Sequence, residues 1–300
     1  MTPNEYLEAV LQDQTLAPGS DELEALQQRG REVKELLRSA FSEHSPSVRD
    51  AGSYEKGTMV RTSYDYDALC YFPHDTGVGD NLAEISDEVF RVLSEEYTVE
   101  RKRSALRLHN ATDHEDPEYF HMDVVPGRFM DGDDGDVALH QSGGEKDWLK
   151  TNPEEHIRHV KESGVRDAIK LAKVWREKSG FTIPTFVLEL LVIKVLDGHQ
   201  DEDLEDQMVH LWTVLRDRAE NITVKDPAND NNDLSTVFDA AAKITLAHAA
   251  EAALNKAEAD NWEGIFGKVE AKTQENVADA LKGAAAGTSN PSRSYCDDER

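Results

Sequence analysis

Apolar residues follow two different spacings along the chain, and the change falls near residue 152. From residue 48 to about 145, short apolar runs such as residues 68–72 stand between polar segments, which predicts strands with a helix near 80–96. Beyond Asn152 and Pro153, apolar residues recur at helical spacing almost to the end of the chain. Asn followed by Pro is typical of a helix cap and first turn. The pattern therefore predicts a mixed α+β domain followed by a helical domain.

The segment before the mixed domain predicts one long helix. Ser20 is a good N-cap, and apolar residues follow it at helical spacing over about 23 residues, enough to brace two lobes. We expect an N-terminal extension at residues 1–19, the bracing helix and mixed domain at 20–152, and the helical domain at 153–285. Residues 286–300 are poor in apolar side chains, which predicts a mobile tail.

Acidic residues stand at the entrance of two apolar strands. Asp65 and Asp67 precede the apolar run at 68–72, and Asp123 lies in a second such run at 122–126. Side chains two apart on a strand share a face, so this pair can hold one cation, or two cations a few ångströms apart. Carboxylate oxygens are the ligands that magnesium prefers, and two such ions stabilise both oxygens of an in-line phosphoryl displacement. An acidic pair at this spacing is also common on strands without catalytic roles, but acids flanking apolar strands are costly without cations.

Gly52 and Ser53 come before these acids and predict a tight turn. Glycine lets the backbone approach a ligand closely, and backbone N–H groups with a hydroxyl suit a triphosphate. Lys56 and Thr58 are near enough in the sequence to support that turn.

The formal net charge of -27 restricts the partners of the protein. A field of that sign repels phosphate backbones, so we expect no binding of long nucleic acid. The one basic cluster is Arg101–Arg103 with Arg107, for which a structural role and a triphosphate-facing role both remain open. A saline habitat would also explain the acidity.

The remaining composition favours a soluble cytoplasmic protein. No stretch approaches the roughly 20 apolar residues that span a bilayer, and the N-terminus lacks a signal peptide, so we expect no membrane association. The two cysteines, Cys70 and Cys296, are far apart, which argues against a disulfide framework. No Cys/His cluster has the spacing of a zinc site.

The motifs resemble those of a known superfamily. Residues 52–58 (GSYEKGT), 65–67 (DYD) and 123–126 (DVVP) resemble the nucleotidyltransferases of the DNA polymerase β superfamily. The chain is most similar to the cGAS-like and oligoadenylate-synthetase branch, which includes the bacterial CD-NTases of CBASS-type anti-phage defence. Further similar segments follow in family order, at 147–153, 171–175, 184–191 and 222–229.

This resemblance implies a fold and a set of roles. The fold would be a polymerase-β-like palm followed by an all-helical C-terminal lobe, with the active site in the cleft between them. Two Mg²⁺ ions are implied, for which Mn²⁺ can substitute. Lys173 would reach the triphosphate from the helical lobe. Without the resemblance, a lysine at this position is expected to be a solvated helix residue. The expected catalytic and metal-binding residues are Asp65, Asp67 and Asp123, and the expected nucleotide-binding residues are Gly52, Ser53, Lys56, Thr58 and Lys173.

The function implied is that of a magnesium-dependent nucleotidyltransferase. It would convert nucleoside triphosphates into a short cyclic oligonucleotide second messenger with release of pyrophosphate, in bacterial anti-phage signalling. ATP is the expected substrate, and GTP or other nucleoside triphosphates remain open. A downstream effector that binds the product and a regulatory protein are the implied partners. A linear oligonucleotide synthase or terminal nucleotidyltransferase is the alternative enzyme, and a catalytically inactive scaffold is the alternative without chemistry.

Overall fold

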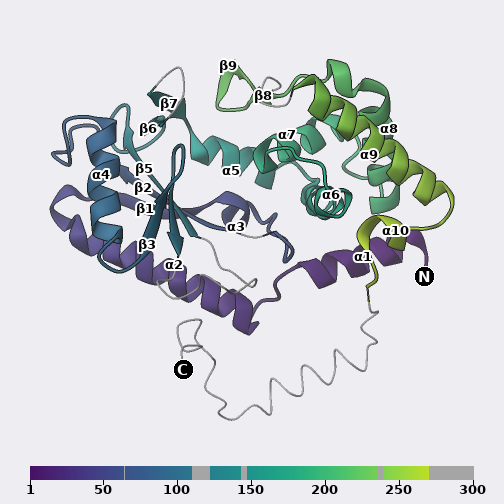
Figure 1. Cartoon of the computed structure of the whole chain (residues 1–300), viewed down its shortest axis with the longest axis horizontal. Helices are drawn as coiled ribbons and strands as arrows, with labels where there is room; N and C mark the ends of the chain where they lie inside the picture. Colours follow the sequence, from purple (N-terminus) through teal and green to yellow (C-terminus); the bar gives the residue numbers. More distant parts are fainter. Residues whose placement is uncertain (64, 110–121, 143–146, 235–238, 270–300) are drawn as a thin grey trace, which may run out of the picture.

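The computed structural model describes residues 1–63, 65–109, 122–142, 147–234 and 239–269, and the chain forms two lobes (Figure 1). One lobe is built on a sheet and the other on helices, as the apolar pattern predicted. β7 ends at Thr151 and α5 begins at Pro153, with the Asn152 side chain accepting a hydrogen bond from the Glu155 N–H. The predicted boundary between the mixed and helical domains therefore falls between two elements.

A seven-stranded sheet forms the first lobe, in the order β1-β2-β5-β4-β3, with β6 pairing β5 and β7. β2 and β5 are parallel, and the other pairs are antiparallel. The strands are β1 (Ser47–Ala51), β2 (Tyr66–Phe72), β3 (Thr98–Arg101), β4 (Leu106–His109), β5 (Met122–Phe129), β6 (Val137–His140) and β7 (Trp148–Thr151).

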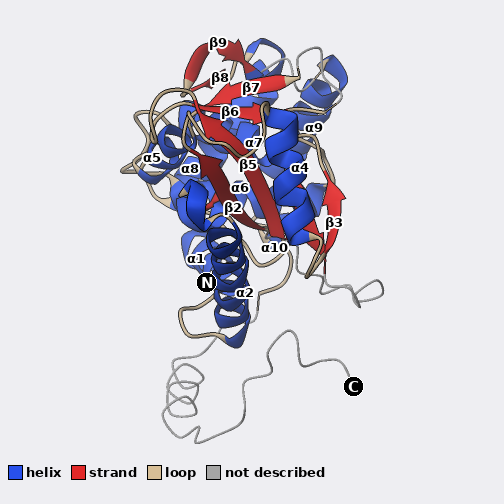
Figure 2. Cartoon of the chain, turned by 90° about the vertical axis from the view of Figure 1, so that its left-hand side faces the viewer, coloured by secondary structure: helices blue, strands red, loops and turns tan. Residues whose placement is uncertain are grey.

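Two helices cover one face of this sheet (Figure 2). They are α2 (Asp21–Ala40) and α4 (Leu82–Leu93). Ser20 caps α2 by accepting the Leu23 N–H, as predicted, and the helix is 20 residues long. Alternate residues of β2 and β5, such as Ala68 and Val124, pack with both helices in one core. Because side chains alternate across a strand, the acidic residues of β2 and β5 lie on the opposite face.

The first residues of the chain belong to the helical lobe, which differs from the predicted extension. They form α1 (Pro3–Gln14), whose cap Thr2 and residue Glu5 make a reciprocal capping box. Tyr6, Leu7 and Val10 of this helix lie in the core of the second lobe. Three apolar residues on one stripe are too few to stand out against a polar background, although they suffice to dock a three-turn helix.

The second lobe is helical, as predicted, apart from a small hairpin that the sequence pattern did not indicate. Its elements are α5 (Pro153–Lys161), α6 (Arg166–Ser179), α7 (Thr185–Val195), α8 (Leu204–Arg218), β8 (Lys225–Asp226), β9 (Asn229–Asp233), α9 (Ala240–Glu258) and α10 (Glu263–Phe266). Single turns of 3-10 helix occur at η1 (Ser42–His44) and η2 (Ala219–Asn221). In the hairpin the buried Asp226 carboxylate accepts hydrogen bonds from the Ala228 N–H and the Asn232 amide. Polar contacts of this kind leave no apolar periodicity in the sequence.

Three tryptophans mark the core of the helical lobe. The rings of Trp175 and Trp262 lie 6.0 and 5.8 Å from the ring of Trp212. Within the described ranges, no helix combines the length and the apolar character needed to cross a bilayer. Residues 286–300, the predicted tail, lie outside the described part of the chain.

Candidate active site

Charged residues form a row across the face of the sheet that is turned away from α2 and α4. The register places Asp67 of β2 beside Asp123 of β5, and Asp123 beside Arg107 of β4. Ala51 of β1 lies on the other side of Asp67. Directly opposed residues of neighbouring strands share a face, and Asp65, two positions before Asp67, joins them there. Three segments distant in sequence thus meet on one side of the sheet.

The surroundings of Asp67 raise its pKa. Burial, then Asp123 and Asp65, raise its pKa to about 7, against the smaller lowering effects of Lys56 and Arg107. A carboxyl held this way favours a proton or a cation. The cause is the tertiary structure, because two further carboxylates are brought beside Asp67 in a partly desolvated place.

Gly52 lies directly against the Asp67 carboxylate. Its φ of +59° is a conformation that side chains rarely adopt, and a Cβ at this position would overlap the Asp67 carboxyl group. Gly52 begins α3 (Gly52–Lys56), so the predicted turn is the start of a short helix. Ser53 follows and is partly exposed. The predicted phosphate-binding pair therefore adjoins the predicted metal-binding acid.

The Arg107 guanidinium connects two of the acids. Its Nε and Nη2 donate to the two oxygens of Asp123 at 2.8 Å each, and Nη2 also donates to Asp65 Oδ2 at 3.1 Å. Among the described residues, no three acidic, histidine or cysteine side chains converge as a preformed metal cage. Carboxylates are the donor type that magnesium prefers, but both oxygens of Asp123 and one oxygen of Asp65 accept hydrogen bonds from Arg107.

A polar contact on the opposite face holds the strand of the acids in place. Tyr66, between Asp65 and Asp67, donates its hydroxyl hydrogen to Asp50, which also pairs with Lys34 of α2. A Cβ on Gly30 of α2 would overlap the Tyr66 ring. Glycine in a helix interior normally lowers stability, so Gly30 is explained by the room that Tyr66 requires.

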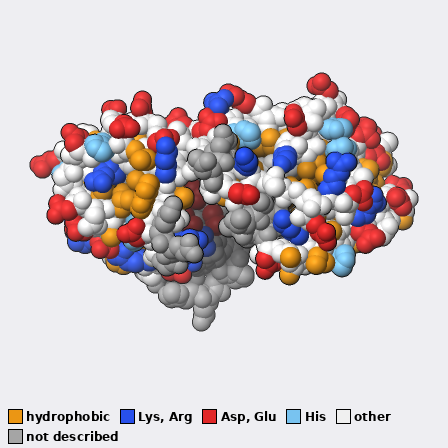
Figure 3. All heavy atoms as spheres, turned by 90° about the horizontal axis from the view of Figure 1, so that it is seen from above, with side chains coloured by type: hydrophobic (Ala, Val, Ile, Leu, Met, Phe, Trp, Pro, Cys, Tyr) orange, Lys and Arg blue, Asp and Glu red, His pale blue; other side chains and the backbone are white. Residues whose placement is uncertain are grey.

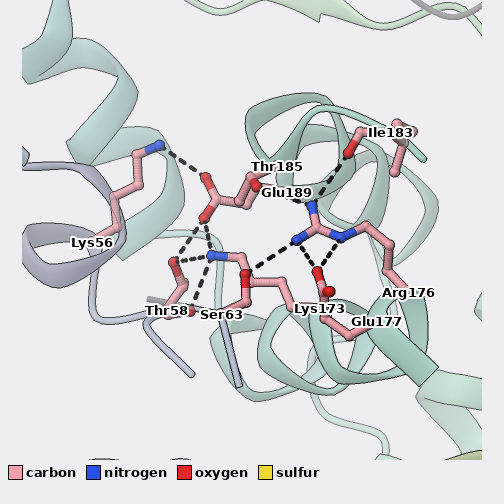
Figure 4. Close-up of polar contacts among 9 residues, drawn as sticks. All are labelled: Lys56, Thr58, Ser63, Lys173, Arg176, Glu177, Ile183, Thr185 and Glu189. Carbon is pink, nitrogen blue, oxygen red and sulfur yellow. Dashed lines mark hydrogen bonds and ion pairs between the residues drawn. The ribbon is translucent and has the colours of Figure 1, made fainter. Parts of the chain in front are cut away.

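The predicted residues Lys56, Thr58 and Lys173 form a second, buried cluster around Glu189 (Figure 4). Glu189 of α7 accepts from Lys56 Nζ at 2.8 Å, Thr58 Oγ1 at 2.7 Å and Lys173 Nζ at 2.6 Å. Lys173 also donates to the carbonyl oxygen and hydroxyl of Thr58, at 3.0 Å each. Only 1% of the Lys173 and Glu189 side chains is exposed. We call this four-residue cluster the clamp, because it joins the segment after Gly52 to the helical lobe.

Glu189 is the charged carboxylate of the clamp. Burial raises the pKa of Glu189, but Lys173 and Lys56 outweigh it and lower that pKa to about 2. Burial lowers the pKa of Lys173, and Glu189 opposes that shift, so desolvation offsets part of the attraction. Nearby, Arg176 donates to the Ile183 carbonyl oxygen and the Thr185 hydroxyl, which fixes the start of α7 (Figure 4).

The sequence-predicted residues therefore fall into two groups. Asp65, Asp67, Asp123 and Gly52 meet on the sheet, whereas Lys56, Thr58 and Lys173 meet at Glu189. Lys173 has three hydrogen bonds for its three N–H groups, so its predicted triphosphate contact stays a prediction. The sequence showed Glu189 as a lone acid in an apolar helix, a signal that it needs a partner. It contained no comparable signal for Tyr66.

The basic cluster near residue 101 is structural in part. Arg101 stacks on Phe90, 3.9 Å from the ring centroid, and pairs with Asp87. Lys102 pairs with Glu100. Acidic side chains are spread over both lobes on the face in Figure 3, with basic ones among them.

The fold and this row of acids define a nucleotidyltransferase of the polymerase-β type. Residues 1–163 match the Second Messenger Oligonucleotide or Dinucleotide Synthetase (SMODS) domain, so the chain belongs to that family of cGAS-like bacterial enzymes. No curated protein matches the chain in sequence.

Solved structures share the fold at low sequence identity. CdnC of E. coli MS115-1 with ATP is 16% identical, with 89% of this chain and 98% of that one covered and a TM-score of 0.70. CdnG of Bradyrhizobium diazoefficiens in complex with GTP is 14% identical, with 95% and 100% covered and a TM-score of 0.69. DncV of Vibrio cholerae, a cyclic AMP-GMP synthase, is 16% identical, with 86% and 93% covered and a TM-score of 0.62.

Proposed function

We propose that this protein is a magnesium-dependent synthase that joins nucleoside triphosphates into a short cyclic oligonucleotide and releases pyrophosphate. The observation that carries the proposal is the row on the sheet. It brings three carboxylates together, one of which, Asp67, lies against Gly52, and the pKa of Asp67 is raised to about 7 by burial and by the other two acids. Such a site attracts positive charge and leaves the backbone free to approach a phosphate.

The donor set fits magnesium in its chemistry. The three residues supply carboxylate oxygens, and burial together with the two neighbouring acids raises the pKa of Asp67, so that a cation there would be favoured. Magnesium bound there would supply positive charge to the triphosphate and to the departing pyrophosphate. We assign Asp65, Asp67 and Asp123 as its ligands, with Mn²⁺ able to replace it.

The chain's own groups position the reactants. The Gly52 backbone and the Ser53 hydroxyl hold the β- and γ-phosphates, close to Asp67. Asp123 helps to remove the proton from the attacking ribose hydroxyl. The ribose oxygen then forms a bond to the α-phosphorus while the bond from that phosphorus to the bridging oxygen breaks, and pyrophosphate leaves. Positioning of this kind is the main protein contribution to phosphoryl transfer.

The related structures support the choice of substrates and of a partner. The relatives named above were solved with ATP and with GTP, so we propose nucleoside triphosphates of one or both kinds as substrates. CdnC of E. coli was also solved in complex with a HORMA protein, and we propose a regulatory protein for this chain too. Anti-phage signalling from the cytoplasm through an effector that binds the product follows from the family and is part of the proposal.

The test is direct product analysis. The purified protein is incubated with labelled nucleoside triphosphates and Mg²⁺, and products are treated with phosphatase and with nucleases. A phosphatase-resistant, nuclease-sensitive product supports a cyclic oligonucleotide, whereas a phosphatase-sensitive ladder indicates a linear oligonucleotide synthase or terminal transferase. Asp67→Asn should abolish the product, and Asp133→Asn, in an exposed loop, should leave it intact. Absence of product under all conditions, with pyrophosphate release also absent, would support the inactive scaffold.

A further inference from the structure

Arg107 lies where the proposed function requires a cation. Its guanidinium bonds both oxygens of Asp123 and one oxygen of Asp65, at 2.8, 2.8 and 3.1 Å. A bidentate contact between arginine and carboxylate is among the stronger hydrogen-bonded pairs. These are three of the four carboxylate oxygens that Asp123 and Asp65 could offer a metal ion.

The strand fixes this placement. Leu106 and Leu108, on either side of Arg107 in β4, are buried in the core beneath the sheet. Arg107 itself is in register with Asp123 on one side and with Glu100 of β3 on the other. Its side chain is 22% exposed, and that of Asp123 is 15% exposed. The pair therefore lies in a partly desolvated place, where charge interactions are stronger than in bulk water.

Like charges explain why an arginine is needed there. Three carboxylates close together repel one another. The Arg107 charge opposes this repulsion, because its guanidinium donates hydrogen bonds to two of the three carboxylates, those of Asp123 and Asp65. A guanidinium stays charged at every working pH.

We propose that Arg107 is a resident counterion that holds the acids together before a divalent cation binds, and that it competes with this cation for Asp65 and Asp123. The inference rests on the proposed function. A bound cation would have to displace the longer contact to Asp65 and share the Asp123 oxygens with the guanidinium. Arg107 is thus a positioning residue whose removal strengthens metal binding, because a competitor and a like charge are removed together.

A purely structural arginine would not behave in this way. If Arg107 only joined β4 to β5, its replacement would lower the melting temperature and leave metal affinity unchanged or weakened. The direction of the change in metal affinity therefore separates the two roles, and it is read without any catalytic turnover.

The experiment measures Mn²⁺ binding to the full-length protein without nucleotide, from the loss of the free-ion EPR signal. The -27 net charge attracts Mn²⁺ elsewhere on the surface, so binding to Asp67→Asn is subtracted as background. Arg107→Gln is compared with wild type and with Arg91→Gln. Arg91 also bridges two carboxylates, Glu88 and Glu95 at 3.0 Å each, but on the exposed surface of α4. This control removes the same charge far from the acids.

We expect Arg107→Gln to bind Mn²⁺ about ten- to a hundred-fold more tightly, the equivalent of one charged hydrogen bond, and Arg91→Gln to match wild type. Arg107→Lys keeps the charge without the fork and should show a smaller increase; it serves alone if the glutamine variant does not fold. If the Arg107 variants bind Mn²⁺ no more tightly than wild type does, the proposal is overturned. The proposed function still stands in that case, provided that wild type binds Mn²⁺ above the Asp67→Asn background. If wild type and variants bind no more Mn²⁺ than Asp67→Asn, the metal site and the role of Arg107 both fail.

Discussion

Replacement of Glu189 by glutamine tests whether the clamp holds the two lobes together. Glutamine keeps the size of the side chain but removes the charge that faces Lys56 and Lys173, and its amide nitrogen must meet a donor. Lys56 is 11% exposed and can turn toward water, whereas Lys173 is 1% exposed and cannot. Breaking a buried pair by removing one partner costs about 3–5 kcal/mol. We expect the lower end of that range, because one of the two lysines finds water.

The assay is thermal unfolding followed by circular dichroism near neutral pH. For a chain of this size, 1 kcal/mol shifts the melting temperature by roughly 2–4 °C, so Glu189→Gln should melt about 6–12 °C below wild type. Glu88→Gln removes one partner of the exposed Glu88–Arg91 pair and should shift the melting temperature by no more than about 2 °C. The double variant Lys173→Met, Glu189→Met should recover much of the loss, because apolar groups of similar volume often replace a buried pair without penalty.

The pH dependence of this difference follows from the lowered pKa of Glu189. The carboxyl has a pKa of about 2 in the folded protein against 4.5 ordinarily. Its contribution to the free energy of unfolding is therefore present above about pH 4.5 and is lost as the pH falls toward 2. The gap in stability between wild type and Glu189→Gln should narrow over that window. Equal melting temperatures for the two proteins at pH 7 would refute the reasoning, since the clamp would then contribute nothing to holding the fold.

Other predictions concern the sheet. Asp67→Asn should abolish turnover with Mg²⁺. In metal-free buffer it should melt above wild type at pH 8, because the folded pKa of about 7 against the ordinary 3.8 makes the wild-type acid increasingly destabilising as the pH rises between these two values. The gain should vanish near pH 4, and a variant that melts below wild type at pH 8 would contradict the prediction. Gly52→Ala should abolish turnover and lower stability more than Gly132→Ala, because Gly132 has a similar positive φ but nothing within 4 Å of a Cβ. Equal effects of the two variants in activity and melting assays would show that contact with Asp67 is irrelevant. Gly30→Ala should lower the melting temperature because the new Cβ meets the Tyr66 ring, although alanine is the better helix former by about 1 kcal/mol. A higher melting temperature would mean that the ring moves freely.

The sequence by itself indicated most of the elements and the candidate residues of the site. Apolar spacing indicated the bracing helix after Ser20, the strand at 68–72 and the change of pattern at Asn152, because burial of one face imposes a period on each element. Gly52 and the acids at 65, 67 and 123 were recognisable as a set, because close approach to phosphate and charge for a cation each demand particular residue types. The family followed from the order of these motifs.

Only the tertiary structure decided which of these groups touch. Local spacing reports that a side chain is buried but not what it is buried against, so Glu189 was visible as an acid in need of a partner and its lysines were not. The contact of Arg107 with Asp123 depends on the order of strands in the sheet, which is set by pairings distant in sequence. The same holds for α1, whose few apolar residues gain a core only when the helical lobe, which begins about 150 positions later, folds against them.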